Sequence, residues 1–234
     1  MKDKLAVFDI DGTVFRWTFI SELLTNLTKR GVFSKSVLKQ TEEVYFNWKD
    51  RKGSWDDYIN TVVKVTNQAL IGKDERQVDK VINEIVEAKK ENLYVYTREL
   101  IKKLKNENYF LLAISASPEK IIAPFTLFLG FDKYFGTIYE IKSGKFTGRE
   151  LNDIIFSKHE VLTQFLKENP QITLKDSVGV GDSFSDVSFL EIVETSIAFN
   201  PDLKLADYAK KMGWKIVVER KNVIYNIKEF EFDN

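Results

Sequence analysis

Two aspartates stand two residues apart, directly after a short apolar run near the N-terminus. The run is Leu5–Phe8, and Asp9, Ile10 and Asp11 follow it. In an extended segment, residues i and i+2 project to the same side, so the two carboxylates face one space. Their repulsion raises the pKa of one carboxyl group unless a hard cation such as Mg2+ binds between them. One carboxylate could then attack phosphorus while the other, protonated, donates to the leaving oxygen.

The residues after the second aspartate suit a phosphate group. Gly12 lets the backbone turn closely, and the amides around Gly12 and Thr13 are donors for phosphate oxygens. The segment from Asp9 to Thr13 also fits an ordinary acidic turn at the end of a strand. Groups elsewhere in the chain are needed to decide between these two interpretations.

Further residues have the types that phosphoryl transfer needs. Ser115 follows a second apolar run, and Asp182 and Asp186 are four residues apart after a third. Either aspartate could complete a metal site, and Lys158 could neutralise the charge that develops on a phosphoryl group. Each also has a plain alternative, because serine and aspartate often cap helices and most lysines lie in solvent.

Alternating strands and helices must position these groups. After residue 110, buried-type strands are predicted at 110–114, 177–180, 196–199 and 215–218, with helices between them and a hairpin over 137–148 that turns at Ser143-Gly144. This alternation predicts an α/β fold, a doubly wound, Rossmann-like parallel sheet with helices on both faces. Ligands of such sheets bind at the carboxyl ends of the strands, where the polar groups above are found.

A helical block interrupts this pattern directly after the first strand. Residues 18–90 contain four segments with apolar residues at helical spacing, which predicts a small helical bundle. We therefore divide the chain into a core of residues 1–15 and 91–234 and a cap of residues 16–90. Arg16, Trp17, Arg51 and Trp55 are the cap residues placed to select a substrate. Arginine pairs with carboxylate or phosphate, and tryptophan stacks on a ring or a quaternary ammonium.

Composition excludes several other kinds of chemistry. The 234 residues include 35 basic and 35 acidic side chains, so the chain has no net charge to attract nucleic acid or an anionic membrane. It has no cysteine and one histidine, His159, which excludes disulfides, cysteine nucleophiles and multi-histidine metal sites. We find no signal peptide or membrane span and expect a cytoplasmic protein whose partner is a small phosphorylated molecule. The sequence does not predict an oligomeric state.

Taken in order, these motifs resemble those of the haloacid dehalogenase superfamily. Phe8 to Thr13 is similar to its first motif, Ile114-Ser115 to the second, Lys158 to the third and Gly181 to Asp186 to the fourth. A helical insertion after the first motif resembles the type 1 cap of the phosphoserine phosphatase-like branch. The resemblance covers nearly the whole chain and implies a phosphohydrolase.

The resemblance also implies roles for individual residues. Asp9 would form an aspartyl-phosphate, Asp11 would be the general acid and base, and Mg2+ would bind Asp9, the backbone carbonyl of Asp11, and Asp182, with Asp186 in support. The phosphoryl group would be held by Gly12, Thr13, Ser115, Ala116 and Lys158. The chain departs from phosphoserine phosphatases at Thr18, where that branch has a substrate-binding glutamate, and at Ala116-Ser117, where it has two glycines.

The sequence thus predicts a Mg2+-dependent phosphomonoester hydrolase that acts on a small cytosolic metabolite through an aspartyl-phosphate. Two alternatives stay open: a phosphotransferase or mutase on the same scaffold, and a phosphate-binding module without catalysis. The second carboxylate, Asp11, favours an enzyme, because a receiver-like module needs no acid and base at that position.

Overall fold

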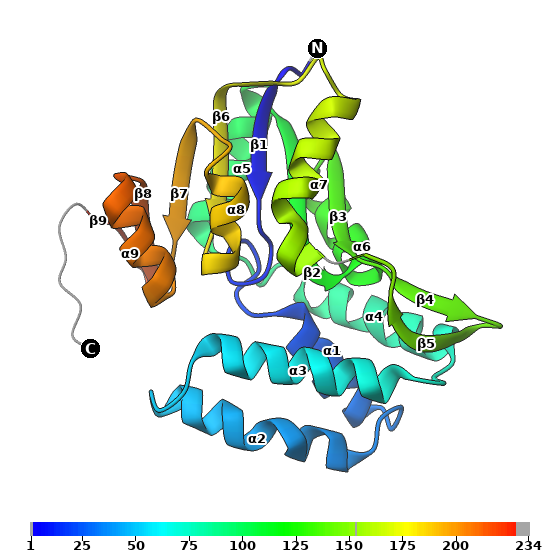
Figure 1. The fold of residues 1–234 in the computed structure, drawn as a ribbon. Helices are drawn as coiled ribbons and strands as arrows, with labels where there is room; N and C mark the ends of the chain where they lie inside the picture. The colour runs from blue at the N-terminus through cyan, green and yellow to red at the C-terminus, as the bar shows by residue number, and fades with distance from the viewer. Residues whose placement is uncertain (1, 153, 228–234) are drawn as a thin grey trace.

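The computed structural model describes residues 2–152 and 154–227. A seven-stranded sheet forms its centre, in the order β3-β2-β1-β6-β7-β8-β9 (Figure 1). Neighbouring strands are parallel except for β8 and β9, which are antiparallel. Their bounds are Lys4–Phe8 (β1), Phe110–Pro118 (β2), Lys133–Thr137 (β3), Thr173–Gly181 (β6), Thr195–Phe199 (β7), Lys215–Arg220 (β8) and Val223–Ile227 (β9). The predicted doubly wound sheet is confirmed.

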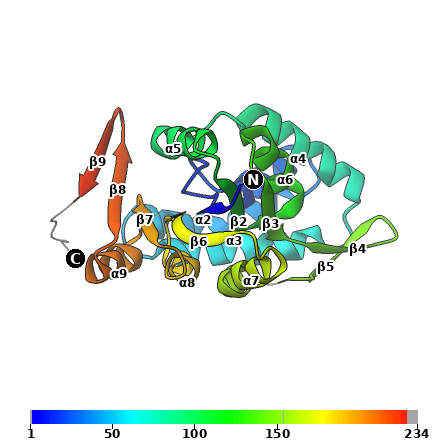
Figure 2. The ribbon, with the colours of Figure 1, turned by 90° about the horizontal axis from the view of Figure 1, so that it is seen from above.

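Helices cover both faces of this sheet, as the view from above shows (Figure 2). One face carries α5 (Val95–Asn106) and α6 (Glu119–Leu129), and the other carries α7 (Ile154–Glu168), α8 (Val187–Leu190) and α9 (Leu203–Met212). Strand β1 shows why both faces are filled. Ala6 and Phe8 belong to the core on the first face, and Leu5 and Val7 to the core on the second. All four are fully buried, as expected for a central parallel strand.

A block of helices lies across the carboxyl ends of the strands (Figure 1). It consists of α1 (Phe19–Lys29), α2 (Lys35–Lys49), α3 (Trp55–Leu70) and α4 (Glu75–Lys89). Polar side chains cap their N-termini: Thr18, Ser34, Ser54 in a full capping box, and Asp74. Apolar residues of α1, α3 and α4 continue the core of the first sheet face, so burial joins the block to the sheet.

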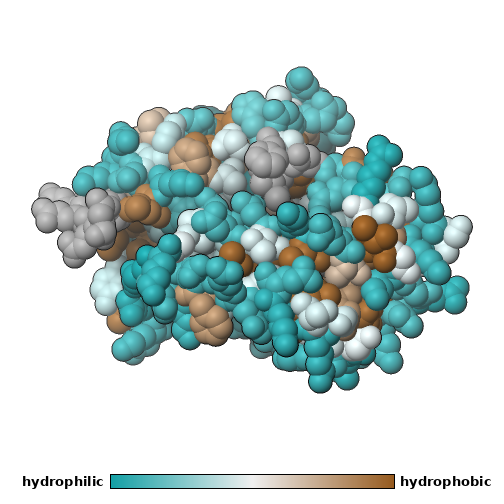
Figure 3. Space-filling view, turned by 60° about the horizontal axis from the view of Figure 1, so that its bottom comes forward, coloured by the Kyte–Doolittle hydropathy of each residue, from teal (hydrophilic) through white to brown (hydrophobic). Residues whose placement is uncertain are grey.

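The chain enters and leaves this block along two adjacent segments. The Arg16 amide donates to the Asn92 carbonyl at 2.9 Å, and Phe15 pairs with Leu93 in an antiparallel bridge. The face on which α2 lies is mostly hydrophilic, with apolar residues in small groups (Figure 3). Within residues 2–152 and 154–227, no helix has both the length and the apolar character needed to cross a membrane.

A hairpin outside the main sheet holds the block on one side. Strands β4 (Tyr139–Lys142) and β5 (Lys145–Glu150) project past the sheet beside α4 (Figures 1 and 2). Gly72 donates its amide to the Phe146 carbonyl at 2.8 Å, and Phe146 donates to the Lys73 carbonyl at 3.1 Å. Because both bonds are between backbone groups, the turn between α3 and α4 is joined to the hairpin as an added strand would be.

The structure differs from the predicted elements in a few places. The predicted hairpin over 137–148 begins later than expected, since Thr137 ends β3 of the main sheet and β4 begins at Tyr139. Helix α5 and strand β9 were not predicted at all. Most residues of β9 are exposed, so the sequence has no buried alternation there to indicate a strand.

Candidate active site

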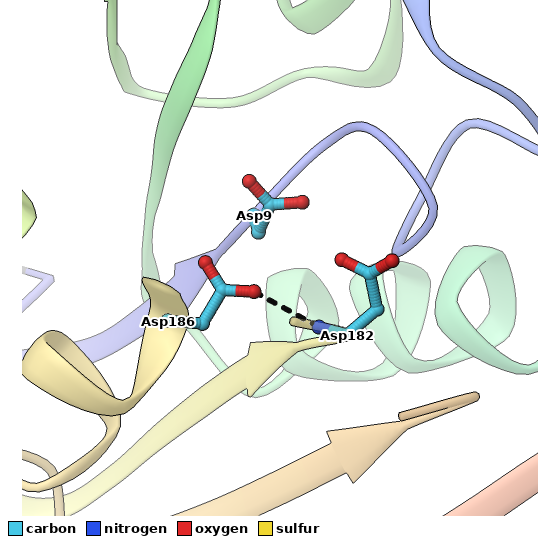
Figure 4. A group of neighbouring side chains, drawn as sticks. All are labelled: Asp9, Asp182 and Asp186. Atoms are coloured by element: carbon cyan, nitrogen blue, oxygen red, sulfur yellow. Dashed lines mark hydrogen bonds between the residues drawn. The ribbon is translucent and has the colours of Figure 1, made fainter. Parts of the chain in front are cut away.

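Three carboxylates meet where strands β1 and β6 end. Asp9 follows β1, and its amide donates to the Val180 carbonyl at 2.9 Å, which continues the pairing with β6. Asp182 follows β6, and Asp186 ends a short 3-10 helix, η1 (Phe184–Asp186). One oxygen from each of the three side chains lies within 4.8 Å of the others, and all three face a common space (Figure 4).

Lys158 is buried against two of these carboxylates. Its Nζ donates to Asp9 Oδ1 at 2.7 Å and to Asp186 Oδ1 at 2.6 Å. Helix α7 carries it into place, and non-helical dihedral angles at Ser157 bend this helix one residue before it. Burial alone would lower the Lys158 pKa, but the carboxylates of Asp186 and Asp9 outweigh burial and raise it above the usual range. The side chain therefore stays a cation.

Asp186 positions its neighbours. Oδ2 accepts from the amides of Asp182 and Ser183, each at 3.0 Å, while Oδ1 accepts from Lys158. Both oxygens are thus occupied, whereas Asp9 Oδ2 and Asp182 Oδ2 accept no hydrogen bond from the described residues. Asp186 holds the loop that carries Asp182 and leaves two carboxylate oxygens free nearby.

Asp11 lies apart from these three groups. Asp11 Oδ1 accepts from the Phe19 amide at 2.6 Å, and Oδ2 accepts from the Ser115 hydroxyl at 3.0 Å. Burial raises the Asp11 pKa, and the nearby Ser117 side chain together with the hydrogen bonds from Phe19 and Ser115 opposes the rise. A raised pKa makes it easier for this carboxyl group to carry a proton, as a general acid must.

Burial also controls the charge of the other carboxylates. It raises the Asp9 pKa to about 7, against the attraction of Lys158, and raises the Asp182 pKa well above its ordinary value, with repulsion from Asp9 and Asp186 adding to the effect. Three carboxylates face one ammonium group, so the site lacks positive charge. Asp9 and Asp182, each with a free oxygen, therefore fit a hard divalent cation such as Mg2+.

The turn after Asp9 packs closely on Asp182. Thr13 is fully buried, and its hydroxyl donates to Asp182 Oδ1 at 3.2 Å. Gly12 has a φ of +80°, and a Cβ built on it would lie 2.0 Å from Asp182 Oδ2. Only glycine satisfies both conditions, because a side chain there would have to displace a carboxylate of the site.

Gly12→Ala should therefore destabilise the protein by about 3 kcal/mol, from the left-handed backbone and the clash together. Gly144→Ala is the matched control. Gly144 has a φ of +73° with nothing within 4 Å of a built Cβ, so alanine there should cost about 1 kcal/mol for the backbone alone. Urea denaturation of both variants measures the difference. Equal losses of stability in the two variants would show that the expected clash of the added methyl group with Asp182 costs nothing.

Two cavities open at this edge of the sheet. The inner one has a volume of 140 Å³ and is bounded by Asp9, Asp11, Ala116, Ser117 and Lys158. The outer one has a volume of 770 Å³, and Arg16, Trp17, Arg51 and Trp55 all line it. Trp55, Asp56 and Asp182 border both cavities. The structure thus brings the four predicted specificity residues to one cavity next to the carboxylates.

Other residues take positions that the sequence did not indicate. Ser117 faces the inner cavity, while the Ser115 hydroxyl is fully buried on Asp11. Trp48, on α2, is half-buried and lines the outer cavity. Thr18 borders the inner cavity and caps α1 by accepting from the Ser21 amide. The cavity therefore has an uncharged hydroxyl group at this position. Ser115 and Ser117 are two residues apart in β2, so strand alternation puts both on the same side and could not separate their roles.

The chain resembles known phosphatases over most of its length. The family model of the haloacid dehalogenase-like hydrolases matches residues 6–191. Phosphoserine phosphatase SerB1 of Mycobacterium tuberculosis is 30% identical over 223 residues, which cover 90% of this chain and 69% of that protein. Histidinol-phosphatase of Neisseria meningitidis is 25% identical, over 91% of this chain and 97% of that protein.

Solved structures share the fold. A protein of unknown function from Bordetella pertussis Tohama I has a TM-score of 0.76 at 19% identity, over 92% of this chain and 98% of that one. A phospho-aspartyl intermediate analogue of phosphoserine phosphatase has a TM-score of 0.62 at 25% identity, over 94% and 95%. The resemblance drawn from the motifs is confirmed: this chain belongs to the haloacid dehalogenase-like hydrolases and is a phosphatase-like member of that family.

Proposed function

We propose that the protein is a Mg2+-dependent phosphomonoester hydrolase that acts through an aspartyl-phosphate on Asp9. The observation that carries the proposal is the pairing of two unlike aspartates at one cavity. Asp9 is held by a buried ammonium group, and Asp11 is held by the Phe19 amide and the Ser115 hydroxyl. Two carboxyl groups in different surroundings can divide the roles of nucleophile and acid.

The chemistry follows from these positions. A carboxylate oxygen of Asp9 forms a bond to phosphorus as the bond from phosphorus to the leaving oxygen breaks. Asp11 gives its proton to that oxygen and afterwards takes one from water, which attacks the acyl phosphate and regenerates Asp9. Lys158 offsets the negative charge that builds up on the phosphoryl oxygens. Alcohol and phosphate are the products, and both aspartates return to their starting states.

Asp9 and Asp182 are the side chains that would hold Mg2+, with the Asp11 carbonyl predicted beside them. A bound Mg2+ would lower the cost of bringing an anionic phosphate to a site with several carboxylates. Thr13, Gly12 and Asp186 position Asp182 for this task through the contacts described above. We further propose residues 16–90 as the cap that closes over the phosphate and excludes water.

Phosphate release from a panel of phosphomonoesters tests this function. The purified protein should release phosphate in 5 mM MgCl2, which is on the order of the concentration that fills weak metal sites. Phosphate release should stop when excess chelator is added. Release that continues in the chelator would contradict the metal requirement. Transfer to an added alcohol, with no release to water, would identify a phosphotransferase instead.

Magnesium should stabilise the protein more at high pH than at low pH. The folded carboxyl groups of Asp9 and Asp182 have raised pKa values, so below about pH 7 the folded protein holds protons that a metal must displace. Without metal, the contribution of these groups to the free energy of unfolding should rise as the pH falls from 7 toward 4, because the folded protein takes up more protons than the unfolded chain. Above pH 7 the same groups are charged in both states and destabilise the fold. The rise in Tm on adding Mg2+ should be about 4 °C larger at pH 8 than at pH 5.5.

Differential scanning fluorimetry at the two pH values measures this, with equal ionic strength throughout. Asp182→Asn is the control variant, in which the pH dependence of the shift should shrink. Equal shifts at both pH values would contradict displacement of protons by the metal.

A further inference from the structure

The outer cavity is a second compartment beside the reacting groups, and its size bears on the substrate. The inner cavity holds 140 Å³, and Ile20, Ile59 and Val63 form part of its wall. The cation that borders it, Lys158, is already paired with Asp9 and Asp186. The inner cavity thus suits a phosphoryl group and a short apolar link, with no free cation for a carboxylate on the leaving group. The rest of a substrate extends past Trp55 into the 770 Å³ of the outer cavity.

Three indole rings line the outer cavity. The ring centroids of Trp17 and Trp48 are 6.1 Å apart, those of Trp17 and Trp55 are 5.7 Å apart, and those of Trp48 and Trp55 are 4.7 Å apart. The rings cross at angles of 50°, 66° and 58°, so none of the three stacks face to face on another. Trp48 is stacked on Tyr58, at 5.8 Å between centroids and 11° between planes, so one of its faces is covered. The half-buried parts of the three indoles that stay uncovered offer π surface to a planar ligand.

Among the described charged side chains around these rings, the cations without a partner outnumber the free acids. Arg16 pairs with Glu219 at 3.6 Å, and Lys204 with Asp56 at 2.9 Å. The side chains of Lys49 and Arg51 also line the cavity and form no ion pair or hydrogen bond with the described residues. The remaining acid of the outer wall, Asp202, is engaged by the amides of Leu205 and Phe184. Among the described residues, the outer cavity therefore presents two cations without an ion pair. Apart from Asp182, a proposed metal ligand, its acidic side chains are already engaged.

From these observations we propose that the substrate's leaving group is a planar aromatic ring with an oxyanion substituent, bound between the indoles and the Lys49 and Arg51 side chains. This inference rests on the proposed phosphomonoesterase function and names its substrate class. Indoles also attract quaternary ammonium groups, but the neighbouring unpaired cations repel a positively charged ligand. Choline-like and amine-bearing phosphate esters are therefore disfavoured, histidinol phosphate among them.

A matched series of esters tests ring charge at constant shape: 4-carboxyphenyl, phenyl and 4-(aminomethyl)phenyl phosphate. The value of kcat/KM should fall in that order, by about fivefold at each step. Acetyl phosphate, which is too small to reach the outer cavity, reports the phosphohydrolase chemistry by itself. Equal kcat/KM for the three aryl esters, with acetyl phosphate hydrolysed, would overturn the inference and leave the proposed function standing. If none of the four is hydrolysed, the proposed function fails.

Arg51→Gly removes one of the unpaired cations with a built-in check on folding. Arg51 has a φ of 60°, which glycine adopts more easily than arginine, so the variant should be at least as stable as the wild type. Its preference for the carboxyphenyl over the phenyl ester should fall about fivefold. Lys52→Gly, in the same loop but outside the cavity wall, is the control and should keep the preference. An unchanged preference in Arg51→Gly would exclude a role for this side chain.

Binding gives a readout that does not depend on turnover. Three of the four tryptophans line the outer cavity, while Trp214 packs on Tyr208 next to α9. Titration of the Asp9→Asn protein with 4-carboxyphenyl phosphate should quench most of the tryptophan fluorescence. The 4-(aminomethyl)phenyl ester should need about 20-fold higher concentration for the same effect. Quenching with equal affinity for both esters would also overturn the inference, whether or not either ester is hydrolysed.

Discussion

Replacing Asp9 by asparagine should lower kcat for every phosphomonoester by at least about ten-thousandfold, because the amide oxygen is too weak a nucleophile to attack phosphorus. The fold should survive the change. The asparagine Oδ1 can still accept from Lys158, and Asp186 keeps that ammonium group paired. One substitution should therefore separate chemistry from structure.

Steady-state phosphate release and a melting curve measure the two effects. Incubation with 32P-labelled substrate followed by acid quenching should label the wild-type protein and leave Asp9→Asn unlabelled. Asp207→Asn, an exposed aspartate on α9, is the matched control and should keep full activity. Activity in Asp9→Asn above about one tenth of the wild-type value would rule out Asp9 as the nucleophile.

Lys158→Met should have the largest effect on stability, a loss of about 3–5 kcal/mol in the absence of metal. The ammonium group is buried and is the partner of both Asp9 and Asp186. Its removal leaves these carboxylates and Asp182 close together without a cation, so their repulsion and their lost solvation are no longer offset. Activity should fall as well, because the phosphoryl oxygens would lose the ammonium group that offsets their negative charge.

Urea denaturation compares this variant with Lys167→Met, which removes an exposed lysine from the same helix and should change stability little. Lowering the pH from 8 to 5.5 should recover part of the lost stability in Lys158→Met, because the carboxyl groups can then take up protons. A loss no larger than that of Lys167→Met would mean that the buried ion pairs do not hold the site together.

The fold was predictable because its signals are local. Helical spacing of apolar residues identified α1 to α4, and polar caps such as the Ser54 capping box fix where these helices begin. The edge of the sheet where the aspartates gather follows from a general rule of parallel sheets. Strand β9 was not predicted because most of its residues are exposed, so they show no alternation of buried and exposed positions.

The site was predictable in its members and less so in its contacts. Motif spacing indicated that Asp9 and Lys158, 149 residues apart, share one place, and the structure brings them to 2.7 Å. That Lys158 also binds Asp186, and that Ser115 turns to Asp11 while Ser117 faces the cavity, depends on side-chain rotamers in the folded molecule. Such choices are set by tertiary packing, which no short stretch of sequence records.

The β4–β5 hairpin fixes one side of the helical layer to the core. On its side, backbone hydrogen bonds from Gly72 and Phe146 tie the helices to the core, and nearby Lys120 on α6 pairs with Glu75 and Asp79 on α4. On the opposite side, the exposed Lys204–Asp56 ion pair spans the boundary, and such pairs break readily in water. The helical layer is therefore held by backbone hydrogen bonds and ion pairs beside the hairpin, and by an exposed ion pair at the edge between the start of α3 and α9, where Asp56 and Lys204 line the outer cavity.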